Sequence, residues 1–232
     1  MSLYLLINFF SIAIPFGFSF HKQLSFYKNW YALWPALFVP GAVFIVWDIL
    51  FTKMGVWGFN PDYLANFYIL GLPYEELLFF FCIPYACVFT YASLNRLIKQ
   101  DLFGNYARSV TWFLIVLLGL LGVLNIQKWY TGVTFISSAF FLLIHQQILN
   151  SKYLGRFYLA YLVVFLGPFF LVNGILTGSF IEEPVVWYNN SENLSLRIFT
   201  IPVEDFIYGM LLFLMNVTIY ETKLARKNQK HG

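Results

Sequence analysis

Charged residues are scarce in this sequence. Only 11% of its 232 residues are Asp, Glu, Lys or Arg, whereas a soluble domain carries about 25%. Because 60% of the residues are hydrophobic, a water-soluble globule would lack the charges that its surface needs. The composition therefore excludes a soluble domain and predicts that much of the surface faces lipid.

Cysteine is also rare, and the usual nucleotide and zinc motifs are missing. Cys82 and Cys87 lie five residues apart in one apolar run, where helical geometry turns them to different faces, so we expect neither a disulfide nor a metal pair. There is no G-x-G-x-x-G, P-loop or H-E-x-x-H motif, so nothing supports a nucleotide cofactor or a zinc site. The basic residues form no continuous patch, which argues against nucleic-acid binding.

Long apolar runs are plentiful. A helix needs about 20 residues to cross the hydrocarbon core of a bilayer. The first run is not typical of a signal peptide, because Lys22 and Lys28 follow it instead of preceding it. The sequence therefore predicts an all-α integral membrane protein with seven transmembrane helices. The seven runs are 3–20, 32–51, 74–95, 110–126, 131–149, 155–177 and 200–221.

The basic residues predict how these helices are oriented. Of the 14 Lys and Arg residues, all but Lys53, Lys128 and Arg197 fall on one side of the seven-helix arrangement. Because basic residues accumulate in cytoplasmic loops, we expect the N-terminus outside and the C-terminus in the cytoplasm, in a cell inner membrane. A retinal protein is excluded, because the last run has no lysine before Lys223 at its inner end.

Most acidic residues lie on the opposite side, and two acidic pairs share one motif. The segments Gly71-Leu-Pro-Tyr-Glu-Glu-Leu-Leu-Phe-Phe80 and Thr200-Ile-Pro-Val-Glu-Asp-Phe-Ile-Tyr208 both read Pro-x-acid-acid-apolar and lie 129 residues apart. Upstream, Val46-Trp-Asp-Ile-Leu50 matches Val172-Asn-Gly-Ile-Leu176 at an offset of 126. The two offsets agree to within a three-residue insertion, which indicates a duplication.

The duplication predicts three parts of the chain. We expect a first repeat in residues 1–100, a linking helix in 101–128 and a second repeat in 129–232. The two three-helix repeats would be parallel and related by an axis along the membrane normal. In that arrangement the two acidic pairs lie at equal depth on one side of the membrane.

Carboxylates at these positions admit two interpretations. Proline followed by two acids is an ordinary helix start, because the helix dipole favours negative charge there. Acids that border the bilayer, however, are costly and usually functional. A carboxyl group in apolar surroundings beside a second carboxyl can act as a general acid, an ionised neighbour can act as a base, and aromatic faces attract a developing cation. The combination predicts acid-initiated carbocation chemistry on a lipid.

At these motifs the sequence resembles the small membrane-integral carotenoid cyclases. The first half of that family is similar to Val46–Leu50, to Gly55-Val-Trp-Gly-Phe-Asn60 and to the first acidic segment. The second half is similar to Trp187-Tyr-Asn189 followed by Ile201-Pro-Val-Glu-Asp-Phe206. The resemblance covers nearly the whole chain and is to the form in which the two halves are joined, as in archaea and fungi.

The resemblance implies a lycopene cyclase, most often one that converts the acyclic ends of lycopene to β-ionone rings. The implied reaction is a net isomerisation. A proton adds to the terminal alkene, the resulting cation closes on the chain, and a proton leaves. It implies no redox cofactor and no metal, and its partners would be lycopene or a related acyclic carotenoid and the lipid bilayer.

The same resemblance implies a set of site residues. Glu75 or Glu76 and Glu204 or Asp205 are the candidate acid and base, and Asp48 is a candidate to orient or share the proton. Because the repeat counterpart of Asp48 is Gly174, the halves are not equivalent, and we expect one central site. The candidate residues for binding the substrate are Trp47, Phe79, Phe80, Asn173 and Tyr208.

Other interpretations stay open. The chain could be a non-catalytic or carotenoid-binding subunit in which the acids only cap helices. It could be a proton-coupled transporter, although such proteins break helices near the membrane midplane. Within the family, an ε-ring product would differ only in which proton leaves. The sequence contains no indication of the oligomeric state.

Overall fold

The structure, a computed structural model, describes residues 2–149 and 151–231, which are mostly helical. The α-helices are α1 (Leu3–Phe18), α2 (Trp30–Met54), α3 (Tyr74–Leu97), α4 (Gly104–Leu124), α5 (Trp129–Ile144), α6 (Leu154–Val164), α7 (Phe170–Leu176) and α8 (Val203–His231). Shorter turns are the 3-10 helices η1 (Phe26–Asn29) and η2 (Pro61–Tyr63) and the π-helices η3 (His145–Leu149) and η4 (Phe165–Phe169). The strands are β1 (Trp57–Phe59), β2 (Tyr68–Ile69), β3 (Leu72–Pro73), β4 (Val186–Tyr188), β5 (Arg197–Ile198) and β6 (Ile201–Pro202).

Each of the seven apolar runs contains a helix, which confirms the predicted helical class. Helices α6 and α7, joined by η4, form one continuous segment over Leu154–Leu176. Within the described residues six segments are long and apolar enough to cross a membrane, and α1, with 16 residues, is shorter. The helix in the last run begins at Val203 and not, as predicted, at residue 200, because Ile201 and Pro202 form a strand.

The contacts divide the chain into two compact units. Unit 1 contains the described residues in 1–51, 61–99 and 212–232, and unit 2 contains those in 52–60 and 100–211. The repeats predicted from the sequence, residues 1–100 and 129–232, follow a different division of the chain.

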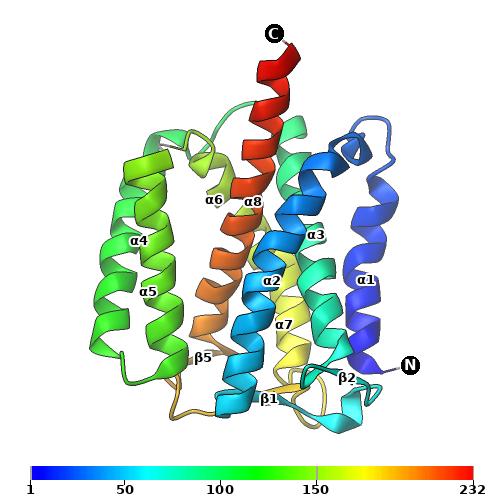
Figure 1. The fold of residues 1–232 in the computed structure, drawn as a ribbon, viewed down its shortest axis with the longest axis vertical. Coiled ribbons are helices and arrows are strands. Elements are labelled where there is room, and N and C mark those ends of the chain that lie inside the picture. Colours follow the sequence, from blue (N-terminus) through cyan, green and yellow to red (C-terminus); the bar gives the residue numbers. More distant parts are fainter. Residues whose placement is uncertain (1, 150, 232) are drawn as a thin grey trace. The chain divides into compact units, whose positions relative to one another are not determined.

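In unit 1, α1 lies along α3 (Figure 1). Hydrogen bonds join them, one from Asn8 Nδ2 to the backbone oxygen of Glu75 at 2.8 Å and another between Ser19 Oγ, at the C-cap of α1, and Tyr85 Oη at 2.7 Å. Polar contacts of this kind are favoured between helices in an apolar medium, because an unpaired polar group there is costly. The contacts fix α1 beside the start of α3.

Proline inside α2 is compensated by a side chain from α8. Pro40 has no N–H, so the carbonyl of Ala36 loses its usual helical donor. Asn216 Nδ2, which is fully buried, donates to that carbonyl at 2.6 Å. Neighbouring helices commonly satisfy backbone groups that a proline frees in a membrane helix. Asn216 therefore has a packing role, and its Asn-Val-Thr sequon is incidental.

In unit 2, α4 lies along α5 (Figure 1), and strand β1 pairs antiparallel with β4. Gly58 is opposite Trp187 in this pair. A Cβ atom on Gly58 would lie 2.3 Å from Cζ2 of Trp187, so only glycine fits there without a shift. The close approach holds Trp57 and Tyr188 directly opposite one another.

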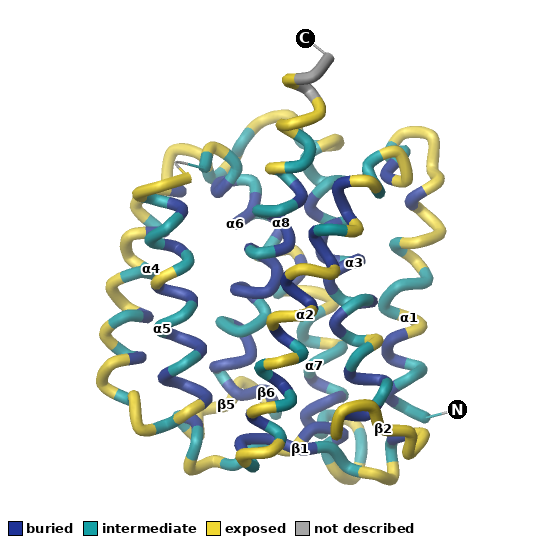
Figure 2. The backbone as a smooth tube through the Cα atoms, viewed as in Figure 1, coloured by how far each residue is buried: buried dark blue, intermediate teal, exposed yellow. Residues whose placement is uncertain are grey.

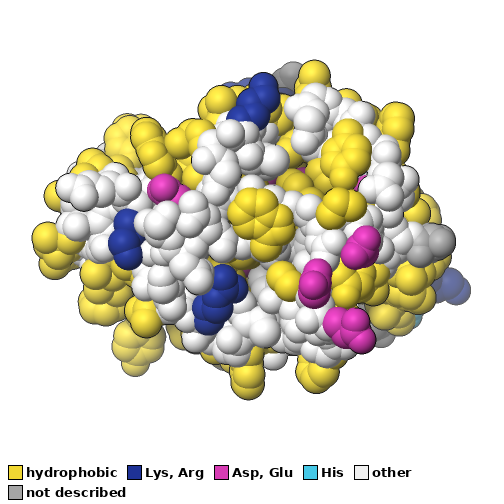
Figure 3. Space-filling model, turned by 90° about the horizontal axis from the view of Figure 1, so that it is seen from below, with side chains coloured by type: hydrophobic (Ala, Val, Ile, Leu, Met, Phe, Trp, Pro, Cys, Tyr) yellow, Lys and Arg dark blue, Asp and Glu magenta, His cyan; other side chains and the backbone are white. Residues whose placement is uncertain are grey.

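Many apolar side chains remain exposed. Along α4, for example, Phe113, Val116, Leu120 and Val123 are each more than half exposed, and Figure 2 shows exposed residues along much of this helix. Hydrophobic side chains also project around the edge of the end-on view in Figure 3. Monomeric soluble proteins rarely expose apolar patches of this extent. Together with the six long apolar helices, they indicate an integral membrane protein.

Candidate active site

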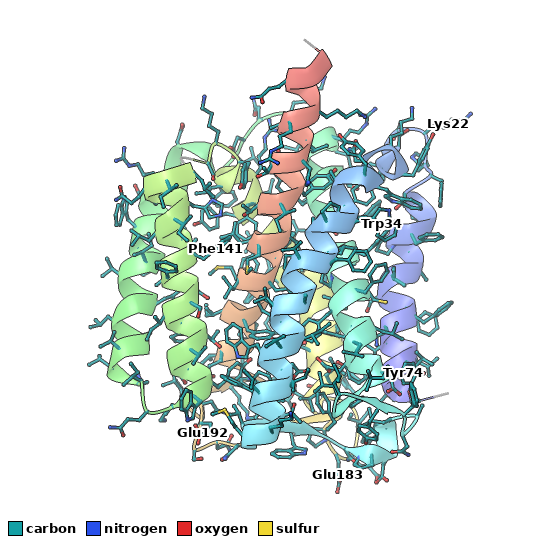
Figure 4. The ribbon with its side chains drawn as sticks, in the orientation of Figure 1. Lys22, Trp34, Tyr74, Phe141, Glu183 and Glu192 are labelled. Carbon is teal, nitrogen blue, oxygen red and sulfur yellow. The ribbon has the colours of Figure 1, made fainter. Side chains whose placement is uncertain are left out.

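Two short hairpins place the acidic pairs at helix starts. Strands β2 and β3 precede α3, and β5 and β6 precede α8. The Tyr74 N–H donates to the Phe67 carbonyl at 2.9 Å, and the Val203 N–H donates to the Leu196 carbonyl at 3.1 Å. Each helix therefore begins where its hairpin ends, with the acids in its first turn. Figure 4 shows Tyr74 at the end of unit 1 opposite Lys22.

Glu75, the first acid of the pair in α3, accepts hydrogen bonds from two earlier segments of the chain. Its Oε1 accepts hydrogen bonds from Ser2 Oγ and from the Ala65 N–H, both at 2.7 Å. The side chain is fully buried, and its Oε2 accepts no hydrogen bond from any residue that the structure describes. These contacts join the start of α1 and the segment before the hairpin to α3.

Glu204, the first acid of the pair in α8, makes the corresponding contacts. Its Oε1 accepts from Thr131 Oγ1 at 2.6 Å and from the Leu194 N–H at 2.8 Å. This side chain is also fully buried, and among the described residues its Oε2 has no hydrogen-bond donor. The acid and both of its donors each lie 129 residues after their counterparts in unit 1.

Glu76, the second acid of the pair in α3, has a different partner. Its Oε2 accepts a hydrogen bond from Tyr4 Oη, which comes from α1. The carboxyl groups of Glu76 and Asp48 also interact electrostatically. Both acids are buried, with 7% of Glu76 and 2% of Asp48 exposed. The structure thus brings together two of the predicted site residues from α2 and α3.

Aromatic rings adjoin this carboxyl pair. The Tyr4 ring centroid lies 6.0 Å from that of Phe79, and Phe79 lies 6.0 Å from Phe80. The contacts continue from Phe80 to Phe44 at 6.3 Å and from Phe44 to Trp47 at 5.4 Å. The predicted residues Trp47, Phe79 and Phe80 are therefore connected to the acids of unit 1 through ring contacts.

Asp205, the second acid of the pair in α8, accepts hydrogen bonds from three side chains. Its Oδ1 accepts from Tyr130 Oη at 2.5 Å, and its Oδ2 accepts from Tyr188 Oη at 3.0 Å and, at a longer 3.5 Å, from Asn173 Nδ2. Only 4% of Asp205 is exposed. Asn173 was predicted as a site residue and meets the predicted Asp205.

Three aromatic rings surround Tyr130. Its centroid lies 5.1 Å from Trp57 in an edge-to-face contact, 5.7 Å from Tyr188 in a stacked contact and 6.2 Å from Tyr208. Tyr208 and Trp57 are also 6.0 Å apart. The predicted residue Tyr208 therefore belongs to this aromatic cluster of unit 2, which we define as Trp57, Tyr130, Tyr188 and Tyr208.

The tyrosine partners of the acids were not predicted from the sequence. Tyr4, Tyr130 and Tyr188 donate to carboxylates that are distant in the sequence, and tyrosine is too common here to stand out. One signal was available, because Ser2 and Thr131 are hydroxyl residues separated by the same 129 residues as the acids. Trp57, which lies in the Gly55–Asn60 segment that resembles the family, is only 6% exposed and belongs to the aromatic cluster.

Among residues 2–149 and 151–231, no group of three or more His, Cys, Asp or Glu side chains could hold a metal ion. His145 is fully buried, and its Nδ1 lies 2.6 Å from Ser151 Oγ, in agreement with a packing role. Glu192 lies at the start of α5 (Figure 4), where its Oε2 accepts from the Trp129 N–H at 3.1 Å.

The fold and these clusters define a class of protein. The chain is a helical membrane protein in which buried carboxyl groups meet tyrosines among aromatic rings. A family model described as lycopene cyclase matches residues 1–94 and 127–222, which is more than half of the chain. The chain therefore belongs to the lycopene cyclase family.

A similar protein of known name agrees with this family. The chain is 27% identical over 146 residues to the bifunctional lycopene cyclase/phytoene synthase of Neurospora crassa. The match covers 61% of this chain but only 21% of that relative, so the chain spans about a fifth of the relative's length. No solved structure matches the chain.

Proposed function

We propose that this protein converts the acyclic ends of lycopene to β-ionone rings. The reaction adds one proton to a terminal alkene and later removes one, so it needs a proton donor, a base and surroundings that tolerate a cation. The observation that carries the proposal is that Glu76 and Asp205 are both buried, both accept from a tyrosine and both adjoin aromatic rings. The family membership supports the same chemistry.

The surroundings of Glu76 and Asp205, the second acids of the two pairs, suggest different roles. Glu76 lies beside Asp48, and a pair of carboxyl groups suits a proton donor because two like charges repel when both ionise. Asp205 accepts from two phenols and one amide, and an ionised carboxylate only accepts hydrogen bonds. We therefore assign proton donation to Glu76 with Asp48, and proton removal to Asp205.

Glu75 and Glu204 have a structural role in this proposal. In each case Oε1 accepts one side-chain hydroxyl and one backbone N–H from the segment before the hairpin. These bonds hold the hairpin and a neighbouring helix start against the acid-bearing helix. Each pair thus combines a first acid that positions the helix start and a second acid for the chemistry.

The proposal includes the duplication and the membrane orientation. The bonds of Glu75 and of Glu204 involve residues at a constant offset of 129, and Leu70 and Phe199, at the same offset, both have a φ of 56°. Such matching contacts support two repeats with a common origin. The loop charges favour a cytoplasmic C-terminus.

Expression in a lycopene-accumulating bacterial host tests the function. Pigments from cells with the wild-type chain, with Glu76→Gln and with an empty vector would be separated by chromatography and identified by absorbance. We expect β-carotene or a one-ringed intermediate from the wild type only, with equal amounts of both proteins in the membrane. Unchanged lycopene with the wild-type protein present would refute the proposal for this chain.

A further inference from the structure

Asp205 differs from the other buried acids because both of its oxygens are held. Tyr130 donates to Oδ1 at 2.5 Å, while Tyr188 donates to Oδ2 at 3.0 Å with Asn173 beside it at 3.5 Å. These donors come from three separate elements, namely α5, β4 and α7. A carboxylate held on both oxygens cannot rotate without losing a hydrogen bond.

The two tyrosines are themselves held in place. Their rings stack with an interplanar angle of 11° at 5.7 Å, and Trp57 meets the Tyr130 ring edge-on at 5.1 Å. Arg197 makes a cation–π contact with Tyr188, and its guanidinium carbon lies 5.8 Å from the ring centroid. Tyr188 also follows Trp187 in β4, opposite Trp57 in the strand pair. The hydroxyl groups are thus fixed by ring packing and by backbone pairing.

Ring closure ends in a choice between three protons. When the new carbon–carbon bond has formed, the positive charge lies on a ring carbon that bears a methyl group. Loss of a proton from the ring carbon that carries the polyene forms the β ring. Loss from the ring CH₂ forms the ε ring, and loss from the methyl group forms an exocyclic double bond. In each case the C–H electron pair becomes the double bond and the base takes the proton, so only the position of the base differs.

We propose that Tyr130 and Tyr188 are positioning residues that aim the oxygens of Asp205 and so decide which ring double bond forms. The inference rests on the proposed function and adds the control of product identity. The aromatic cluster supplies ring faces that stabilise the cation while the proton leaves. Because hydrogen bonds hold each oxygen to within a fraction of an ångström, removing one of them would free Asp205 to reach more than one C–H bond.

The test compares the isomers formed by single hydroxyl deletions. Wild-type chain, Tyr188→Phe and Tyr130→Phe would be expressed in the lycopene-accumulating host, and the cyclised products would be separated and identified by absorbance and NMR. In Tyr188→Phe and in Tyr130→Phe we expect the fraction of minor ring isomers to rise about tenfold. A small change in the difference between the activation barriers for loss of the competing protons is sufficient for such a rise. Asn173→Ala, which affects the longer contact to Oδ2, should give a smaller rise and provides a second route if a tyrosine variant fails to accumulate.

Tyr161→Phe is the matched control. Tyr161 Oη donates to the backbone carbonyl of Phe206 at 2.8 Å, next to Asp205 but not to its carboxylate. This variant loses a part-buried hydroxyl that bonds to the same helix and should keep the wild-type isomer ratio. A merely structural role of Tyr130 and Tyr188 would lower total conversion and leave the ratio unchanged, and that result would overturn the inference. Absence of any cyclised product from the wild type would instead refute the proposed function.

Discussion

Tyr4 donates a hydrogen bond to Oε2 of Glu76, a residue 72 positions further along the chain. The phenol comes from the second residue of α1, and the acid comes from the first turn of α3. Asp48, on α2, interacts with the same carboxyl group through its charge. Three helices of unit 1 thus contribute to the environment of one acid.

Removal of the Tyr4 hydroxyl should slow the reaction. In Tyr4→Phe the ring contact with Phe79 is kept and only the donor to Glu76 is lost. A hydrogen bond to a charged or proton-transferring group is worth about 1.5–3 kcal/mol, so we expect conversion to fall by about tenfold or more. Timed assays of lycopene conversion in isolated membranes measure this. Tyr106→Phe, at a side chain that is 66% exposed on α4, is the control. Equal rates in both variants would contradict a role for Tyr4.

The two neighbouring acids of each pair should respond differently to amide substitution. Glu76→Gln and Asp205→Asn should each reduce conversion by about 100-fold or more, because general acid–base groups contribute that much. Glu75→Gln should retain most of the activity, because an amide oxygen can still accept from Ser2 and Ala65.

The control for these acid variants is Glu192→Gln. An amide oxygen at this position can still accept from the Trp129 N–H, so conversion should be close to wild type. Immunoblots of the membrane fraction verify equal protein. If Glu76→Gln kept full activity while Glu75→Gln lost it, the assignment within the pair would be reversed.

Gly58→Ala should disturb the β1–β4 pair. The new Cβ atom would lie 2.3 Å from Trp187, so the strands must separate or the indole must move. Because Trp57 and Tyr188 are paired in the same register, we expect a melting temperature lower by several degrees and reduced conversion. Thermal unfolding of the detergent-purified protein measures the first effect. Gly17→Ala is matched, since a Cβ atom there meets nothing within 4 Å.

Asn216 and Pro40 should show compensating effects on stability. Asn216→Leu leaves the buried carbonyl of Ala36 without its donor, at a cost of about 1–3 kcal/mol. Pro40→Ala restores an N–H that can donate to the same carbonyl, so the double variant should regain much of the lost stability. A double-mutant cycle on the melting temperature measures the coupling. Strictly additive effects would mean that Asn216 does not act through this carbonyl.

The helical architecture was predictable because the physical constraint is local. An apolar run that crosses lipid must satisfy its own backbone hydrogen bonds, so run length and apolar character are sufficient to predict each helix. The Pro-x-acid-acid motif likewise predicted the starts of α3 and α8 to within a few residues. The start of the last run was misplaced, because the strand character of Ile201 and Pro202 depends on pairing with β5.

Which acid meets which partner was decided by the tertiary structure. Glu75 and Glu76 are adjacent in the sequence and chemically alike, yet they point to different groups because successive helix residues are rotated by about 100°. The resulting partners, Ser2 with Ala65 for the first acid and Tyr4 for the second, come from outside the helix that carries the acids.

The sequence by itself determined that this chain is a helical membrane protein of the lycopene cyclase family with two acidic helix starts. Only the tertiary structure divided each pair into an acid that holds a hairpin and an acid that meets a tyrosine. The physical reason is that apolar character and periodicity are properties of short segments. Hydrogen-bond partners, in contrast, depend on how whole helices are rotated and packed, to within a fraction of an ångström.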